Sequence, residues 1–116
     1  MVDNTSSVNQ HDGLPKTIEG NYLQEIHPRT NYIRLYPRNH EHKFTLIWLH
    51  GLGDTAHGFS DDFADEHLGL VPATCKVVLP TAPIRAVTCN DGENMTSWYD
   101  ILESGSSTYA SKDQMR

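Results

Sequence analysis

Histidines, serines, cysteines and one glycine-rich loop are the features of this 116-residue chain that could carry chemistry. The seven histidines suggest a metal site, but the close pairs in sequence are only His40 with His42 and His50 with His57. Neither pair has the i, i+4 spacing that puts two ligands on one face of a helix, and no Cys-x-x-Cys motif accompanies them. We therefore expect no metal site and no cofactor.

The glycine-rich loop reads His50-Gly51-Leu52-Gly53-Asp54 and follows an apolar run. Such a loop could hold a phosphate on its backbone N–H groups. It has, however, no third glycine at the dinucleotide spacing and no Gly-Lys-Ser/Thr sequence. The spacing alone leaves two interpretations open, a loop that faces a substrate and a plain glycine turn after a strand.

Length and charge exclude several classes of protein. The chain carries 9 basic and 15 acidic residues, a net charge of −6 with histidine neutral, and is long enough for one small domain at most. Nucleic acids and anionic membranes are bound by concentrated basic surfaces, which these scattered Lys and Arg residues do not form. We expect neither as a partner.

No stretch of the sequence is typical of a transmembrane helix or of a signal peptide. The first residues lack both a basic start and an apolar segment. We therefore expect a soluble, cytoplasmic protein with no integral membrane segment. In that compartment Cys75 and Cys89 are expected to be reduced thiols rather than a disulfide.

The elements that must position the loop begin after a polar start. Residues 1–20 are turn-prone and without periodicity, which predicts a disordered N-terminal tail, and the domain then covers residues 21–116. Two short β-like runs, Tyr22–Ile26 and Tyr32–Tyr36, are separated by the breaker pair His27-Pro28. This arrangement indicates a hairpin or two edge strands.

A strand, a helix and a second strand surround the glycine-rich loop. Phe44–Leu49 is almost continuously apolar, which is typical of a strand buried on both faces of a mostly parallel sheet. Cys75–Leu79 is a second short apolar run. The helix is indicated by residues at helical spacing: Phe59, Phe63, Ala64 and His67. The order predicts a βαβ unit and an α/β fold with a mostly parallel sheet.

The sequence beyond the second strand gives weaker signals. Residues 81–99 show no sustained period and predict a long functional loop with a turn at Asn90-Asp91-Gly92. Ser111 and Gln114 have the spacing of a helix capping box close to the last residue. Because one helical turn cannot repay its nucleation cost, either the cap is accidental or the sequence is incomplete.

Two blocks of the sequence resemble the phospholipase/carboxylesterase family of α/β-hydrolases, which contains the acyl-protein thioesterases. They are LHGLGDTAHGF at residues 49–59 and VVLPTAPIRAVTCNDGENMTSWYDI at residues 77–101. The resemblance runs from about Phe44 to about Leu102. It implies a partial α/β-hydrolase fold that lacks its C-terminal half.

In this family a serine in a Gly-x-Ser-x-Gly elbow attacks the acyl group, a histidine acts as base and an aspartate orients the histidine. No serine of the chain has glycine at both flanking positions. Ser60, within Gly58-Phe59-Ser60-Asp61-Asp62, lacks the second glycine. The resemblance therefore stops before the nucleophile, and we place no nucleophile, acid or base in this chain.

The resemblance implies that the backbone N–H of Leu52 is one of two donors to the oxyanion of the reaction. Gly51 and Gly53 would let the loop turn and bring its backbone near the substrate. Asp54 would brace the loop or cap the following helix. His50, which has no serine partner, would position the loop.

Trp98 resembles the family's aromatic residue near the substrate channel, with a core position as the alternative. Together these residues predict a serine hydrolase of carboxylic esters or thioesters, such as S-acylated proteins or lysophospholipids, with the 116-residue chain inactive alone. Two alternatives stay open. One is a non-catalytic short product that acts as a binding or interaction module, and the other is one half of a two-chain enzyme with a complementing chain.

Overall fold

The computed structural model describes residues 14–103. These residues form two compact units. The first unit contains the described residues up to His50 together with Asp54–Thr81, and the second contains Gly51–Gly53 together with the described residues from Ala82 onward. No helix within residues 14–103 is long and apolar enough to cross a membrane.

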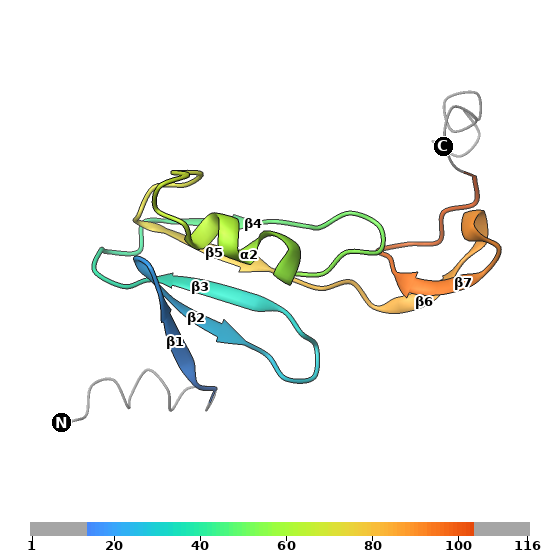
Figure 1. The fold of residues 1–116 in the computed structure, drawn as a ribbon, viewed down its shortest axis with the longest axis horizontal. Coiled ribbons are helices and arrows are strands. Elements are labelled where there is room, and N and C mark those ends of the chain that lie inside the picture. The colour runs from blue at the N-terminus through green and yellow to red at the C-terminus, as the bar shows by residue number, and fades with distance from the viewer. Residues whose placement is uncertain (1–13, 104–116) are drawn as a thin grey trace. The chain divides into compact units, whose positions relative to one another are not determined.

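The described residues of the first unit form a five-stranded sheet and one helix (Figure 1). In chain order its elements are β1 (Lys16–Glu19), β2 (Tyr22–Ile26), β3 (Ile33–Pro37), β4 (Phe44–Ile47), α2 (His57–Ala64) and β5 (Cys75–Leu79). The strands lie in the order β1-β2-β3-β5-β4, so β5 separates β4 from β3. The glycine-rich loop leaves the sheet after β4, which makes this strand and α2 the elements that frame it.

The sheet is not mostly parallel, and the sequence prediction on this point is wrong. β1 and β2, β2 and β3, and β3 and β5 pair antiparallel, whereas β4 and β5 form the one parallel pair of the described residues. Short turns join β1 to β2 and β2 to β3. A strand that follows its neighbour through a short turn runs in the opposite direction, so the two strands pair antiparallel. The α/β class is confirmed, because α2 provides the crossover between β4 and β5.

The predicted hairpin and the predicted βαβ unit are both present. β2 and β3 pair with Ile26 opposite Ile33, and β4 and β5 pair with Phe44 opposite Cys75. The helix is shorter than the sequence pattern indicated, because α2 ends at Ala64 and His67 lies beyond it. The backbone becomes extended at the residue after Ala64, which ends the helical hydrogen bonds there.

Part of the predicted N-terminal tail is a strand. Lys16–Glu19 pairs with β2 as β1, although the sequence assigned residues 1–20 to a tail. With one apolar side chain in four residues, this strand has no hydrophobic period to detect. Residues 1–13 and the helix start predicted at Ser111 lie outside the described residues.

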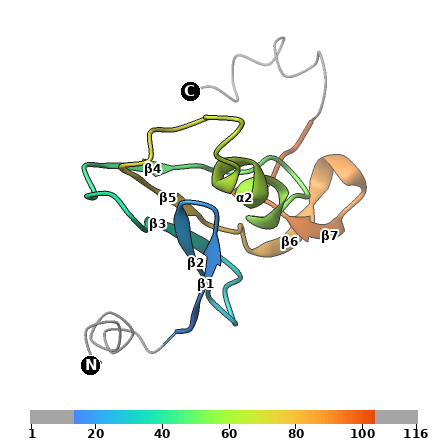
Figure 2. The ribbon, with the colours of Figure 1, turned by 60° about the vertical axis from the view of Figure 1, so that its left-hand side comes forward.

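The core of the first unit lies between one face of the sheet and α2 (Figure 2). The buried residues of this core include Tyr22, Ile33, Leu35, Phe63, Ala64, Cys75, Val77 and Leu79. Each buried aliphatic or aromatic side chain of this size contributes about 1.5–3 kcal/mol relative to an exposed one. Trp48, which follows β4, adds edge-on contacts to Phe59 and Phe63 of α2, with ring centroids 5.1 and 5.5 Å away.

A buried charge cluster lies on the other face of the sheet, because Glu25 and Arg34 alternate with core residues along β2 and β3. Glu25 is completely buried. Lys16 Nζ lies 3.3 Å from its Oε2 atom, and Arg34 Nε lies 2.6 Å from its Oε1 atom. Tyr36 Oη donates to Oε1 at 3.3 Å. These contacts connect β1, β2 and β3 across the hydrogen-bonded register.

β4 is far more exposed than its apolar sequence predicts. Phe44, Ile47 and the following Leu49 all have exposed side chains. The strand pairs with β5 on one side and, within residues 14–103, with no strand on the other. The prediction of a strand buried on both faces is therefore wrong for the described part of the chain.

The second unit contains a hairpin where the sequence predicted a long loop. Its elements are β6 (Ile84–Val87), the 3₁₀ turn η1 (Thr88–Asn90) and β7 (Glu93–Thr96). Asp91 and Gly92 have φ values of 58° and 76°, which confirms the turn expected there. The strands were missed because each has four residues, too few for a sustained alternation of apolar with polar residues, so the turn was the detectable signal.

Candidate functional site

His50 is the residue from which the glycine-rich loop leaves the first unit. The N–H of Trp48 donates to the carbonyl of Val78 at 2.9 Å and so extends the parallel pairing beyond the end of β4. Two residues later the side chain of His50 is buried. A buried ring fixes the start of the loop, and this supports the positioning role expected of His50, which stays a prediction.

Gly53 is the glycine whose backbone conformation the loop requires. Its φ of 81° lies in the left-handed region that favours glycine. Its N–H donates to the carbonyl of Thr96, at the end of β7, at 2.9 Å. Gly51, by contrast, does not have a positive φ, and a Cβ atom built on it would meet nothing within 4 Å. Both glycines were expected to let the loop turn, and this conformational requirement therefore applies mainly to Gly53.

Leu52 lies between these glycines in the second unit. Its side chain is 44% exposed. Within the described residues its N–H donates to no protein acceptor, whereas the neighbouring N–H of Gly53 is occupied by Thr96. The loop thus has one backbone donor held in place beside another that is available to a ligand.

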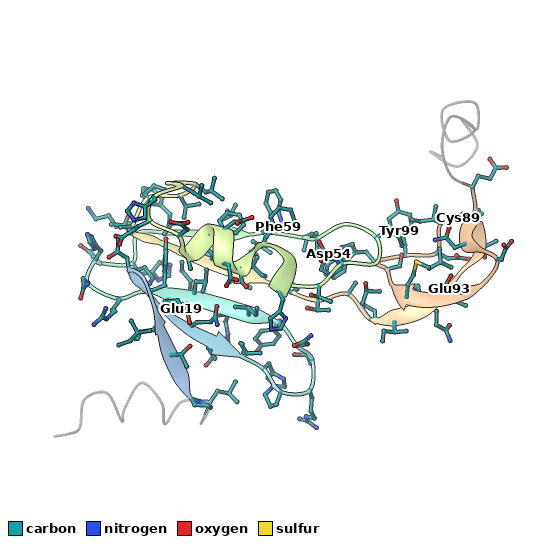
Figure 3. All side chains as sticks on the ribbon, in the orientation of Figure 1. Glu19, Asp54, Phe59, Cys89, Glu93 and Tyr99 are labelled. Carbon is teal, nitrogen blue, oxygen red and sulfur yellow. The ribbon has the colours of Figure 1, made fainter. Side chains whose placement is uncertain are left out.

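Asp54 begins the segment that leads into α2, and Figure 3 labels it there. Its Oδ1 atom accepts the N–H of Thr55 at 2.7 Å. Its carboxylate also lies against Gly58 in the first turn of the helix, where a Cβ atom would collide with it. The helix N-cap is Ala56, which has no side-chain capping hydrogen bond. Of the two roles expected for Asp54, the geometry supports bracing of the loop.

Thr81 completes the start of α2 and was missed by the sequence analysis. Its Oγ1 atom accepts the N–H of Ala56 at 3.0 Å and donates to the carbonyl of Asn31 at 2.6 Å. The hydroxyl therefore joins α2 to the turn that precedes β3. These partners are 25 and 50 residues away in sequence, so no local pattern could have indicated them.

Trp98 is half-buried in the second unit and follows a tightly bonded residue. The N–H of Ser97 donates to Pro83 at 3.1 Å, and its hydroxyl donates to the carbonyl of Tyr99 at 2.5 Å. Arg85 Nε donates to the carbonyl of Ser97 at 3.0 Å. The backbone on both sides of Trp98 is therefore fixed, while its assignment to a substrate channel stays a prediction.

Asp100 fastens the start of the 3₁₀ turn in the same unit. Its two carboxylate oxygens accept the backbone N–H of Thr88 at 2.8 Å and the Thr88 hydroxyl at 2.7 Å. These bonds, the backbone bond first, hold the pKa of the Asp100 carboxyl below its usual value of 3.8, assisted by the charge of Arg85. The bonded form is therefore the carboxylate.

Neither cysteine is placed as a reactive nucleophile. Cys75 is buried and Cys89 is half-buried, and both thiols are free. Burial raises the pKa of the Cys75 thiol, outweighing a hydrogen bond from the backbone of Leu46 that lowers it. A raised pKa reduces the thiolate that a nucleophile needs. Residues 14–103 also contain no group of three or more His, Cys, Asp or Glu side chains that could hold a metal ion.

Comparisons with known proteins agree on one family. The phospholipase/carboxylesterase family profile matches residues 31–115. Acyl-protein thioesterase 1 of Mycosarcoma maydis is 50% identical over 60 residues, which cover 50% of this chain and 24% of that protein. A probable inactive carboxylesterase of Oryza sativa subsp. japonica is 37% identical over 71 residues, which cover 60% of this chain and 28% of that protein.

A solved structure agrees with these matches. The crystal structure of Zea mays acyl-protein thioesterase 2 superposes with a TM-score of 0.52 at 31% sequence identity. The superposition covers 65% of this chain and 30% of that chain. The chain therefore spans between 24% and 30% of the length of these relatives.

Proposed function

The chain belongs to the phospholipase/carboxylesterase family of α/β-hydrolases, and from this premise we propose that it supplies the oxyanion loop of a serine hydrolase of carboxylic esters or thioesters. The observation that carries the proposal is the state of the loop. Gly53 is held by its bond to Thr96, and the adjacent N–H of Leu52 has no protein acceptor within the described residues. A fixed, unoccupied backbone donor is what an oxyanion hole requires.

The chemistry of acyl transfer explains why a backbone donor suits this task. Attack on an ester or thioester places negative charge on the carbonyl oxygen, and a prepositioned N–H stabilises that charge without titrating. One such donor lowers the activation barrier by about 2.7–4 kcal/mol. In this proposal Leu52 gives the donor, His50, Gly51, Gly53 and Asp54 position it, and no metal or cofactor takes part.

The remaining catalytic groups come from outside these residues in the proposal. The sequence has no Gly-x-Ser-x-Gly elbow, so the nucleophile, its base and the second oxyanion donor must be added by further hydrolase sequence. Trp98 would then line the acyl channel beside the loop. Without these groups the chain alone would bind the oxyanion poorly and would turn over no ester.

The relatives narrow the substrate class. The Mycosarcoma maydis and Zea mays proteins are named acyl-protein thioesterases, which favours a thioester on an S-acylated protein as the substrate. Lysophospholipids and small carboxylic esters belong to the same chemical class and stay within the proposal. A cytoplasmic location agrees with such substrates and is likewise proposed.

A non-catalytic role is the second candidate. The Oryza sativa relative is named a probable inactive carboxylesterase, so loss of activity is compatible with this fold. The chain would then bind an acyl ligand or a partner protein without cleaving it.

One experiment separates these roles. The complementing segment is here the part of Mycosarcoma maydis acyl-protein thioesterase 1 that follows its 60 matched residues. The chain alone and the chain mixed with this segment are incubated with a fluorophosphonate probe and a palmitoyl-thioester peptide. We expect labelling and hydrolysis only in the mixture. Labelling of the chain alone would contradict the proposal, and a mixed complex that hydrolyses nothing would favour the non-catalytic role.

A further inference from the structure

Thr81 is the last residue of the first unit and lies where three segments of that unit meet. Its Oγ1 atom accepts the N–H of Ala56 at 3.0 Å and donates to the carbonyl of Asn31 at 2.6 Å. A hydroxyl carries one hydrogen to donate and lone pairs that accept, so this one atom serves both partners. A valine of the same shape would serve neither of them.

The N–H of Ala56 is a donor that needs an acceptor from outside its own helix. Ala56 is the N-cap residue of α2, so its N–H lies ahead of the hydrogen bonds within the helix. The residue is also buried, with 2% of its surface exposed. A buried donor without a partner loses its bond to water and gains nothing in return. The Thr81 hydroxyl is therefore required at the point where the chain enters α2.

Ala56 is also close in sequence to the proposed oxyanion donor, since it lies four residues after Leu52. The N–H of Thr55, in between, donates to Oδ1 of Asp54 at 2.7 Å. That bond joins two neighbouring residues and shapes the segment locally. The bond of Ala56 reaches a residue 25 positions away. It therefore attaches the segment that follows Leu52 to a separate part of the first unit.

The second partner of Thr81 fixes the direction of its hydroxyl. Asn31 lies in the turn between β2 and β3 and has a φ of 60°, in the left-handed region. The N–H of Asn31 donates to the carbonyl of His27, and the N–H of His27 donates to the carbonyl of Tyr32, both at 2.9 Å. The carbonyl that receives the Thr81 hydroxyl thus belongs to a turn closed by its own bonds. This turn orients the hydroxyl, and the hydroxyl then holds Ala56.

We propose that Thr81 is a positioning residue of the oxyanion loop, whose hydroxyl fixes the backbone after Asp54 and so keeps the N–H of Leu52 directed at the carbonyl oxygen of the substrate. Thr81 does not touch the reacting atoms itself. A misplacement of about 1 Å in a catalytic group can cost about 10²-fold in rate, so a bond at some distance from the donor can control catalysis. This inference rests on the proposed function and adds a residue to its machinery.

The first test observes the loop in the chain itself, without catalysis. Thr81→Val removes the hydroxyl at nearly constant volume, and Thr81→Ser keeps it. Thr81→Val should speed amide hydrogen exchange at Ala56 about tenfold or more and shift the amide NMR signal of Leu52, whereas Thr81→Ser should restore both. The control is Thr45→Val, which removes an exposed hydroxyl 2.7 Å from Nε2 of His42 and should change neither signal. Circular dichroism checks that each variant is folded.

The second test measures turnover in the mixture of the chain with the complementing segment. Thr81→Val should lower kcat for a palmitoyl-thioester peptide about tenfold and leave KM within about twofold, and Thr81→Ser should resemble the wild type. In a Leu52→Pro background no donor is left to position, so Thr81→Val should change kcat by less than about twofold. A residue that only stabilises the fold would lower kcat by the same factor in both backgrounds.

The other outcomes are equally decisive. Equal losses of kcat in the two backgrounds would overturn the proposal, and so would an unmoved Leu52 signal or a loss that Thr81→Ser does not restore. A Thr81→Val chain that fails to fold would also overturn it, because Thr81 would then determine the fold rather than the loop. The expected NMR changes in a mixture that hydrolyses nothing would leave the hold of Thr81 on the loop intact and overturn the proposed function alone.

Discussion

A Cβ atom on Gly58 would lie 2.6 Å from Oδ2 of Asp54, so the Asp54 carboxylate occupies the space that a side chain at position 58 needs. The same carboxylate accepts the N–H of Thr55, which fixes it beside the first turn of α2. The absence of a side chain at Gly58 thus allows Asp54 to brace the end of the glycine-rich loop against the helix.

We predict that Gly58→Ala destabilises the chain, although alanine is the better helix former. The Asp54 carboxylate must move aside to admit the methyl group, and the loss of its hydrogen bond to the Thr55 N–H should cost about 1.5–3 kcal/mol of unfolding free energy. In an Asp54→Ala background the clash is absent, and the same substitution should stabilise by about 0.5–1 kcal/mol. Urea unfolding of the four variants of this cycle measures the change of sign. An equal effect in both backgrounds would show that the two positions are independent.

The two glycines of the loop should respond differently to alanine. Gly53→Ala forces a Cβ atom into a backbone with φ of 81°, at a cost of about 1–2 kcal/mol. Gly51→Ala should change stability by less than about 0.5 kcal/mol, because its Cβ would meet open space. Urea unfolding compares the variants, and equal losses at both positions would refute this account of the loop.

Some elements of this fold could be predicted from the sequence alone, and others could not. The β2–β3 hairpin and the β4-α2-β5 crossover were predictable, because apolar periodicity and turn residues specify them locally. The orientation of most of the sheet was not, since it depends on which strands pair. β1, β6 and β7 have four residues each, too few for a recognisable alternation of apolar with polar residues. The register of a sheet is a tertiary property.

The candidate site also has residues that the sequence could indicate and residues that it could not. The residues of the glycine-rich loop could be selected from their types and order, with the help of the family resemblance. Two supporting features could not: the Thr81 hydroxyl, whose partners are 25 and 50 residues away, and the collision that keeps position 58 a glycine. Both exist only once distant segments are packed together.

The buried carboxylate of Glu25 should be a strong determinant of stability in the first unit. Glu25→Gln leaves Lys16 and Arg34 without a neutralising charge on a buried face, and breaking such a cluster costs about 3 kcal/mol or more. Glu19→Gln, which removes the same charge at the end of β1, should cost less than about 0.5 kcal/mol. Thermal unfolding compares the two variants, and Glu25→Gln should have the lower melting temperature. Similar melting temperatures would contradict the stabilising role of the charge cluster.

The bond between Asp100 and Thr88 predicts a pH dependence with a definite sign. The folded carboxyl has a pKa below its usual 3.8, so its contribution to stability is present above that value and is lost as the pH falls through the folded pKa. The amide proton shift of Thr88 should therefore titrate with a midpoint below 3.8. Asp100→Asn should abolish this titration, and Glu93→Gln should preserve it. A midpoint at or above the usual value would contradict the bond.

The oxyanion role of Leu52 is the central claim, and the most direct test removes its N–H. In the mixture of the chain with the complementing segment, Leu52→Pro should lower kcat for a palmitoyl-thioester peptide by about 10²–10³. This is the effect of losing one oxyanion donor. Leu52→Ala keeps the N–H and trims an exposed side chain, so its kcat should stay within about threefold of the wild type. Equal kcat values for the proline and alanine variants, with binding and folding unchanged, would contradict the account.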